Sequence, residues 1–462
     1  MDAAGRTRRP LIDPVCLLAA KSKIPTSLSL GLPSFSPSFF MSTFQNLPGF
    51  RDFYPADCAA RNYLFERWRS VARRCGFAEY EGPVLEPVDL YKRKSGEEIV
   101  KQLFHFTDGG DRGVALRPET TPTLARMAAA SQRDFRKPMK WFQIGSCFRY
   151  ETPQKGRGRE FYQFNCDILG EPSPAADAEL LAVAVETMRS LGFQKEDYII
   201  RLSDRNVWGT FLDQEKIDPA QLPAFLQIID KLEREKEPVT SAKLATLGTT
   251  LEAVQAFISG KAAGYAPLEA VIADLAARGM GESVEIDPGI VRGLAYYTGI
   301  VFEIFDRSRS MRAVAGGGRY DNLCDLIGGT DLPACGFAMG DMVIGNFIRE
   351  TPHAKTLMDL WLQENSRLDA YVVVASEAQR PAALAGLAAL RSAGLSADYA
   401  MTKTKVAKQF QNAELLNAQT AVVYGDEFPA VQVKSLKSRT AETIDAAEVT
   451  AAVQRACLPA GS

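Results

Sequence analysis

Histidine is nearly absent from this chain, and its cysteines follow no metal-binding pattern. The 462 residues include only two histidines, His105 and His353, and the eight cysteines form no C-x-x-C pair and no spacing typical of a disulfide framework. The pattern therefore predicts no zinc site of ordinary ligand spacing, and the question of a bound metal stays open. We interpret the cysteines as reduced thiols, mostly buried, in a cytosolic protein.

The chain also lacks long apolar runs and an excess of charge of one sign. No window of about 18 consecutive apolar residues occurs, so we expect no membrane span and a soluble, cytoplasmic protein. Lys and Arg number 54 against 56 Asp and Glu, and the net charge of -2 does not indicate a nucleic-acid partner. Such a partner would have to be bound by local basic patches.

Length and composition indicate a folded protein with more than one domain. With 46% hydrophobic and 24% charged residues the chain is typical of globular proteins, and 462 residues exceed what one core usually serves. Residues 1–40 differ, because they are rich in Ser and Pro, carry RTRR near their start and include only Asp2 and Asp13 as acids. They could be a transit peptide, but we favour an extension upstream of a start at Met41 and exclude them from the fold.

Periodicity predicts the first elements. The stretch from Asp57 to Cys75 is typical of an amphipathic helix that ends at Gly76. One apolar face of this helix would carry Ala60, Leu64, Trp68 and Val71. The segment LFHFTDGGDRGVALRPE then predicts a hairpin with DGGDRG as its turn, and strands dominate as far as Gly170.

The remaining pattern predicts an insertion and a second domain. Residues 205–280 are typical of helices with little catalytic chemistry, and they would interrupt a core that resumes afterwards. From Ala370 onward strands and helices alternate, which indicates a small three-layer α/β domain. We therefore expect one large domain at 41–366 and another at 367–462.

A basic hairpin is the main candidate for a functional site. The string Phe148-Arg149-Tyr150-Glu151 ends an apolar strand, and TPQKGRG forms a turn before a second strand. The period of two places on one polar face of that strand Phe161, Gln163, Asn165 and Asp167. The basic side chains that could bind phosphate oxygens are Arg149, Lys155, Arg157 and Arg159. A surface hairpin with solvated charges is the simpler alternative.

The stretch FRYETPQKGRGREFYQFNCDILG resembles motif 2 of class II aminoacyl-tRNA synthetases, and its PQxGRxREFxQ core is similar to that of the histidyl-tRNA synthetases. The resemblance implies that Arg149 binds the α-phosphate of ATP and that Arg157 also binds ATP. It further implies that Glu151 contacts the adenine side and that Phe161 stacks on the adenine ring.

The same motif implies contacts to the other two substrates. Gln163 and Asp167 would reach the histidine substrate. Gln154 would face the acceptor end of the tRNA, beside Thr152, where many bacterial members of the family carry arginine.

The string RPETT begins at Arg117 and precedes a helix, and Thr121-Pro122 suits an N-cap followed by proline at the first helical position. By resemblance to the RPExT signature of the family, Glu119 would bind the substrate α-amino group and Thr121 would assist. A capping role alone is the alternative for Thr121.

Two further strings resemble the histidine-specific signatures of the family. In RGLAYYTG, Arg292 would be the electrophilic catalyst that stabilises charge on the α-phosphate, and Ala295 stands where aspartate is usual. In AGGGRYD, the glycines would let backbone approach an imidazole pocket closely, although such a run is by itself more often a turn. The histidine substrate would lie against Tyr296, Tyr297 and Tyr320.

Motif 3 is where the chain departs furthest from the family. In GFAMGDMVI, Met342 and Val343 stand where glutamate and arginine are usual, and that arginine clamps the γ-phosphate of ATP in the family. Because valine cannot make a charge-assisted hydrogen bond, pyrophosphate binding would need another cation, a metal or a weaker contact.

The C-terminal segment resembles the anticodon-binding domain of these synthetases, and the whole resemblance runs from about Thr43 to Val449. The lysines that could contact phosphates are Lys403, Lys405, Lys408, Lys434 and Lys437. A solvated basic surface on a regulatory or dimerisation domain is the alternative.

Together the resemblances imply an α+β fold in which helices flank a class II antiparallel sheet, with a helical insertion and a C-terminal α/β anticodon-binding domain. The implied substrates are L-histidine, ATP with Mg²⁺ and histidine tRNA, with no tightly bound cofactor, and a homodimer is expected by analogy. The alternatives are a synthetase-like regulatory subunit of histidine biosynthesis and an RNA-binding module without catalysis. The retained Arg292, the intact motif 2 and the C-terminal domain favour the enzyme.

Overall fold

The computed structural model describes residues 44–95, 97–293 and 296–457, so the predictions for residues 1–40, the start at Met41 and the departure at Ala295 lie outside the described residues. The chain divides into two compact units, Phe44–Met358 and the part from Asp359 onward. This division falls inside helix α12 (Pro352–Asn365), whereas the sequence suggests a boundary at 366/367. No helix in the described ranges has the length and apolar character needed to cross a membrane.

Within the described residues, eight strands form the main sheet of the larger unit, in the order β1-β5-β6-β11-β10-β9-β7-β8. The strands are β1 (Ala78–Glu79), β5 (Met139–Phe148), β6 (Glu160–Leu169), β7 (Tyr198–Asp204), β8 (Val284–Ile286), β9 (Ile300–Asp306), β10 (Ala315–Arg319) and β11 (Ala334–Gly340). In this order, the neighbouring strands from β5 through β6, β11, β10 and β9 to β7 are all antiparallel. The short edge strands β1 and β8 pair in parallel with β5 and β7. The predicted α+β fold with an antiparallel core sheet is confirmed.

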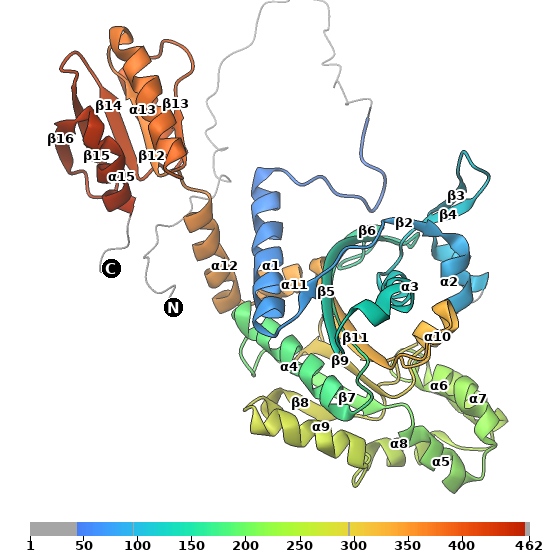
Figure 1. Cartoon of the computed structure of the whole chain (residues 1–462). Coiled ribbons are helices and arrows are strands. Elements are labelled where there is room, and N and C mark those ends of the chain that lie inside the picture. Colours follow the sequence, from blue (N-terminus) through green and yellow to red (C-terminus); the bar gives the residue numbers. More distant parts are fainter. Residues whose placement is uncertain (1–43, 96, 294–295, 458–462) are drawn as a thin grey trace, which may run out of the picture. The chain divides into compact units, whose positions relative to one another are not determined.

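Helices cover both faces of this sheet, and α1 and α3 lie on opposite sides of β5 and β6 (Figure 1). The helices around the sheet are α1 (Pro55–Arg74), α3 (Thr121–Ser131), α4 (Pro174–Ser190), α10 (Leu323–Gly328) and α11 (Asp341–Glu350). Helix α1 begins with a proline at its first position and buries the predicted Leu64, Trp68 and Val71. Trp68 stacks on Phe164 of β6 with ring centroids 5.5 Å apart, so the apolar face of β6 points toward α1.

A smaller three-stranded sheet carries the predicted hairpin. It consists of β2 (Leu85–Pro87), β4 (Gly113–Leu116) and β3 (His105–Thr107), with α2 (Val88–Ser95) following β2. The Asp108 carboxylate accepts hydrogen bonds from the backbone N–H groups of Gly110 and Arg112, at 2.8 and 3.0 Å, which closes the predicted turn.

The N-cap prediction for Thr121 was wrong by one position. Helix α3 already includes Thr121 as its first residue, and its N-cap is Thr120, whose side chain makes no capping hydrogen bond. Proline therefore occupies the second helical position, where its missing N–H costs nothing because the first-turn donors have no partner within the helix. Sequence reasoning places helix ends only to within one or two residues.

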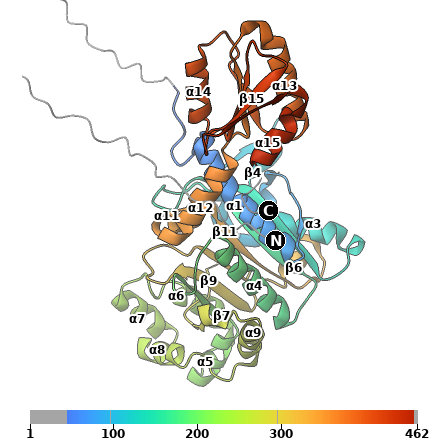
Figure 2. The ribbon, with the colours of Figure 1, turned by 90° about the vertical axis from the view of Figure 1, so that its left-hand side faces the viewer.

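The insertion is helical, as predicted, and its helices gather beyond β7 at the far end of the sheet in Figure 2. They are α5 (Val207–Glu215), α6 (Leu222–Ile229), α7 (Glu237–Thr246), α8 (Leu251–Ser259) and α9 (Ala266–Ala277). Trp208, Phe211 and Phe225 form the centre of a core of its own, and all three side chains are buried.

The second unit is the predicted three-layer α/β domain. Its sheet has the order β13-β12-β14-β15-β16, with β12 parallel to both of its neighbours. The elements are β12 (Ala370–Val374), α13 (Arg380–Ser392), β13 (Ala397–Tyr399), α14 (Val406–Leu415), β14 (Thr420–Tyr424), β15 (Ala430–Ser435), β16 (Ala441–Asp445) and α15 (Val449–Cys457). Val372 faces a core formed with α13 and α15, and Val373 faces another formed with α14.

Candidate functional site

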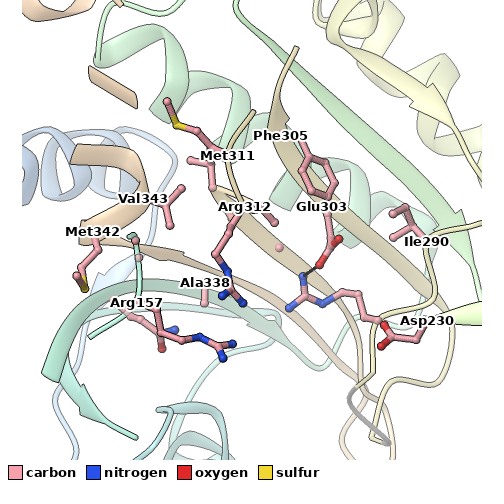
Figure 3. Close-up of a pocket in the computed structure, with 18 of the residues that line it drawn as sticks. Arg157, Asp230, Ile290, Glu303, Phe305, Met311, Arg312, Ala338, Met342 and Val343 are labelled. Atoms are coloured by element: carbon pink, nitrogen blue, oxygen red, sulfur yellow. Dashed lines mark hydrogen bonds and ion pairs between the residues drawn. The ribbon is translucent and has the colours of Figure 1, made fainter. Parts of the chain in front are cut away.

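A pocket of about 860 Å³ in the larger unit gathers most of the predicted site residues, and Figure 3 shows part of its lining. The pocket lies between the β5–β6 loop, strands β6, β9, β10 and β11, and the end of α6. The predicted residues that line it are Glu119, Arg149, Glu151, Arg157, Phe161, Gln163 and Arg292. The predicted residues outside its lining are Thr121, Gln154, Asp167, Tyr296, Tyr297 and Tyr320.

Arg149 and Phe161 form one wall of the pocket. They lie at facing ends of β5 and β6, and the Arg149 guanidinium carbon is 5.3 Å from the centre of the Phe161 ring. The Arg149 Nε donates a hydrogen bond of 2.9 Å to the carbonyl of Pro118, which fixes the guanidinium without neutralising it. A charged group beside an aromatic face suits a ligand that has both phosphate and a flat ring.

The four basic residues of the hairpin do not all face the pocket. Arg157 lines the pocket and forms an ion pair of 2.7 Å with Glu151. Lys155 instead pairs with Glu350 at 3.1 Å, and the Arg159 guanidinium lies 4.4 Å from the centre of the Tyr150 ring. Only two of the four side chains, Arg149 and Arg157, therefore line the pocket.

Gln154 lies at the exposed tip of the same loop. Its backbone N–H donates to the carbonyl of Arg157 at 3.0 Å, and the Arg157 N–H donates back at 2.8 Å. These bonds close a tight turn and leave the Gln154 side chain facing solvent. A macromolecule could reach it there, while a small ligand within the pocket could not.

Glu119 is held by a lysine that sequence reasoning missed. Lys94, at the end of α2, forms a close ion pair with the Glu119 carboxylate, and its ammonium lies 4.0 Å from the centre of the Tyr296 ring. The Tyr296 hydroxyl donates to the other carboxylate oxygen at 3.4 Å. Burial alone would raise the pKa of Glu119, but Lys94 and Arg149 hold the pKa below its ordinary value. Glu119 is thus a fixed anion at the pocket wall.

Arg292 also lines the pocket. Its backbone lies in the left-handed region with φ of 51°, and its guanidinium donates to Glu303 of β9 at 3.0 Å. The guanidinium carbon is 5.5 Å from the centre of the Tyr297 ring, and a Cβ on Gly316 would overlap the guanidinium, so only glycine leaves room there. Burial would lower the pKa of Arg292, but Tyr297 and Glu303 raise it above its ordinary value.

The predicted tyrosines and Asp167 form a buried cluster with one another. Tyr296 contacts both Tyr297 and Tyr320, with ring centroids 4.7 and 5.9 Å apart. The Tyr320 hydroxyl donates to Asp167 at 2.5 Å. Burial raises the pKa of Asp167 to about 7, although the bond from Tyr320 acts in the opposite direction. Asp167 pairs in register with Gly336 of β11, where a Cβ would overlap the carboxylate.

Three residues on neighbouring positions of β5 and β6 have buried polar atoms without a hydrogen-bond partner among the described residues. They are Asp167 Oδ2, the Gln143 side-chain oxygen and nitrogen, and Asn165 Nδ2. Buried polar groups are normally paired, because each unpaired group costs free energy. A concentration of them beside one carboxylate is typical of a place where a polar ligand or ordered water binds.

The insertion contributes more to the pocket than its sequence indicated. We predicted little functional chemistry there, but Asp230, Glu233 and Arg234 all line the pocket. Arg234 pairs with Asp230 at 3.0 Å, and Glu233 pairs with Arg201 of β7 at 2.6 Å. These charges are brought in by the fold of a distant segment, and the run DKLEREKE showed only that the segment is charged.

The segment that resembles motif 3 runs from β11 into α11. Asp341 begins α11, accepts hydrogen bonds from Arg51 at 2.7 Å and from the backbone of Tyr162 at 2.9 Å, and so ties α11 to β6. Met342 and Val343 follow and line the pocket without charge. In the described part of the chain, no group of three or more His, Cys, Asp or Glu side chains could hold a metal ion. Of the seven described cysteines, four are buried and three are partly buried, and none is in a disulfide.

Comparisons with known proteins agree with the sequence resemblance. Two family models match, Histidyl-tRNA synthetase over residues 49–342 and Anticodon binding domain over residues 369–456. The histidine–tRNA ligase of Opitutus terrae is 43% identical over 425 residues, which cover 87% of this chain and 95% of that protein. The chloroplastic/mitochondrial histidine–tRNA ligase of Arabidopsis thaliana is 36% identical over 408 residues, 84% of this chain and 82% of that protein.

Solved structures show the same fold. The histidyl-tRNA synthetase of Nostoc sp. PCC 7120 matches with a TM-score of 0.71 at 23% identity, covering 89% of this chain and 99% of that one. A Bacillus halodurans protein described as an ATP phosphoribosyltransferase regulatory subunit/histidyl-tRNA synthetase matches with a TM-score of 0.64 at 18% identity, covering 83% and 98%. With one family model matching residues 49–342 and a relative 43% identical over most of its length, the chain belongs to the histidyl-tRNA synthetase family.

Proposed function

We propose that this protein is a histidine–tRNA ligase, which activates L-histidine with ATP and then transfers it to histidine tRNA. The observation that carries the proposal is that one pocket is lined by an anion, Glu119, and by two cations, Arg149 and Arg292. An amino acid needs an anion for its ammonium group, and an adenylate-forming reaction needs cations at the α-phosphate.

In this proposal ATP lies along the β5–β6 hairpin. Phe161 stacks on the adenine and Arg149 binds the α-phosphate, which its unneutralised guanidinium beside the ring supports. Glu151 and Arg157, paired with each other in the free protein, contact the adenine side and the phosphates. Mg²⁺ enters with ATP as the MgATP substrate, because this ion is usually held by phosphates and one or two carboxylates.

Histidine lies between Glu119 and the tyrosine cluster. Glu119 binds the α-ammonium group, with Lys94 holding the carboxylate in position, and Thr121 assists from the start of α3. Asp167 accepts the imidazole N–H while Tyr320 holds its other carboxylate oxygen, and the unpartnered, buried Asp167 Oδ2 supports this assignment. The remaining contacts to histidine come from Gln163, Tyr296 and Tyr297.

The first step needs no nucleophile from the protein. A carboxylate oxygen of histidine attacks the α-phosphorus, its new bond to phosphorus forms, and the bond to the bridging oxygen of pyrophosphate breaks. Arg292 and Arg149 stabilise the negative charge that develops on the α-phosphate oxygens. Glu303 holds Arg292 in place, so the guanidinium is oriented before the substrates arrive. This positioning is the main contribution of the protein to the step.

In the second step the terminal adenosine hydroxyl of the tRNA attacks the carbonyl carbon of the adenylate. The ester bond forms, AMP leaves, and the hydroxyl proton is taken up by the released phosphate or by solvent. Gln154, exposed at the tip of the hairpin, would contact the acceptor end of the tRNA. Residues 41–366 are the proposed catalytic domain, and 367–462 the proposed anticodon-binding domain.

The second domain offers a basic surface for the tRNA backbone. Lys403, Lys405 and Lys408 are exposed around the start of α14, and Lys437 is exposed after β15. Lys434 is half-buried, with its ammonium 5.3 Å from the centre of the Phe410 ring. A homodimer and a cytoplasmic location belong to the same proposal, and the free cysteines agree with a reducing compartment.

Exchange of label between pyrophosphate and ATP, measured with each of the twenty amino acids, tests the proposal. We expect exchange with histidine alone. Histidine binding without any exchange would contradict ligase activity and would favour the regulatory-subunit alternative, which gains no support from the curated histidine–tRNA ligases named above. Binding of tRNA without exchange would instead favour an RNA-binding module.

A further inference from the structure

The pocket lacks a cation on α11, where motif 3 would supply one for the terminal phosphates. Met342 and Val343 form this part of the wall, and neither side chain can donate a charge-assisted hydrogen bond. Figure 3 shows Val343 at the same end of the pocket as Arg312, whose guanidinium points into the space that the Arg157 guanidinium also faces.

Arg312 differs from most arginines of the pocket because it has no acidic partner. Among the described residues, no carboxylate lies within ion-pair distance of Arg312 or of Arg149, the residue assigned to the α-phosphate. The paired arginines of the lining are Arg157 with Glu151, Arg201 with Glu233 and Asp287, Arg234 with Asp230, Arg292 with Glu303, and Arg309 with Glu233 and Glu285. Arg312 is therefore a cation available to a ligand.

The charges around Arg312 favour an anion beside it. Arg312 is largely exposed, but its partial burial lowers the pKa of its guanidinium; the positive charges of Arg157, Arg234 and Arg149 lower it further, and only Glu151 acts in the opposite direction. A polyphosphate placed among these cations would relieve their mutual repulsion and receive several charge-assisted hydrogen bonds.

The loop that carries Arg312 is anchored. The Asp306 carboxylate at the end of β9 accepts hydrogen bonds from the backbone N–H groups of Ser310 and Met311, both at 2.9 Å. On the other side of Arg312, the Val314 N–H donates to the carbonyl of Ile304 at 2.7 Å. The backbone on both sides is thus fixed before any ligand arrives, which lowers the entropy cost of using this side chain.

We propose that Arg312 binds the terminal phosphates of ATP and the pyrophosphate that leaves, and so replaces the arginine that Val343 does not provide. The contact is non-covalent, so the atoms exchanged in adenylate formation are unchanged. This inference rests on the proposed function, because it assigns part of the same ATP site.

The variant Arg312→Gln tests the inference by equilibrium binding to the full chain, with a non-hydrolysable ATP analogue compared with AMP. We expect affinity for the ATP analogue to fall roughly 10- to 100-fold. Affinity for AMP, which lacks the terminal phosphates, should stay within about twofold. Arg349→Gln is the matched control, because it removes one positive charge from an exposed side chain of α11 outside the pocket.

Unchanged affinity for the ATP analogue, or equal losses for the ATP analogue and AMP, would overturn the assignment. The double variant Arg312→Gln with Val343→Arg should recover affinity for the ATP analogue, and a double variant no tighter than Arg312→Gln would refute the placement beside Val343. In exchange assays the same loss should appear as a raised KM for pyrophosphate. If the parent protein shows no exchange but Arg312→Gln still loses the ATP analogue selectively, the proposed function fails while the phosphate contact stands.

Discussion

Replacing Asp167 by asparagine should make the protein more stable at high pH and poorer at binding histidine. Burial raises the pKa of Asp167 to about 7 from its ordinary 3.8, so between these values the folded protein holds a proton that the unfolded chain has released. Stability therefore falls as the pH rises from about 4 to about 7. The asparagine cannot ionise but can still accept the hydrogen bond from Tyr320.

The size of the stability change follows from the folded and unfolded pKa values of Asp167. At pH 5 the folded carboxyl is protonated, and asparagine should behave much like it. At pH 8 the parent protein must carry a buried carboxylate. The unfolding free energy of the variant minus that of the parent should therefore be about 3 kcal/mol larger at pH 8 than at pH 5. Loss of the charged acceptor should weaken histidine binding roughly 10- to 100-fold at pH 8.

Urea unfolding without substrates, followed by tryptophan fluorescence, gives the unfolding free energies of variant and parent at pH 5 and at pH 8. Asp325→Asn is the control, since Asp325 is an exposed carboxylate on α10. The reasoning is refuted if the Asp167→Asn difference is the same at both pH values, or if histidine binding is unaffected by the change.

Two further predictions concern the pocket and a third concerns the second domain. Arg292→Ala should lower the exchange rate about 100-fold or more, with ATP affinity measured in parallel to show that binding survives; an unchanged rate would remove Arg292 from the mechanism. Lys94→Met should remove the ion pair of Glu119 and raise the KM for histidine, measured by steady-state exchange, at least about tenfold. The control Lys101→Met, at an exposed lysine, should leave this KM unchanged. Deleting the chain from Ala370 onward should reduce tRNA charging far more than exchange, and equal losses would contradict the proposed anticodon-binding domain.

Local periodicity accounts for what the sequence could predict. The alternation along β6 put Asp167 on the predicted polar face, and the structure places Asp167 against Tyr320 while the intervening Phe164 packs against Trp68. A period of two survives folding because successive side chains of a strand must point to opposite faces. The run AGGGRYD was predicted to let backbone approach an imidazole pocket; a Cβ on Gly316 would overlap the Arg292 guanidinium, and the imidazole pocket itself stays a prediction.

Contacts between segments distant in the sequence could not be predicted from it. Lys94 and Glu119 lie on separate elements, and nothing in the spacing of either indicates that they pair. The charges at Asp230 and Glu233, in the turns after α6, enter the pocket because the insertion folds back to β7, whereas a charged run is usually solvent-exposed. The misplaced N-cap at Thr121 has a different cause, since capping preferences locate a helix start only approximately.

The central claim is that this chain both activates histidine and transfers it to tRNA. The most direct measurement is the formation of histidyl-tRNA by the purified full chain, with ATP, histidine and histidine tRNA, in a tube where exchange has first been recorded. The account predicts exchange followed by ester formation on the tRNA, both lost without ATP. Exchange without charging would contradict the transfer step, and the absence of both would contradict the ligase.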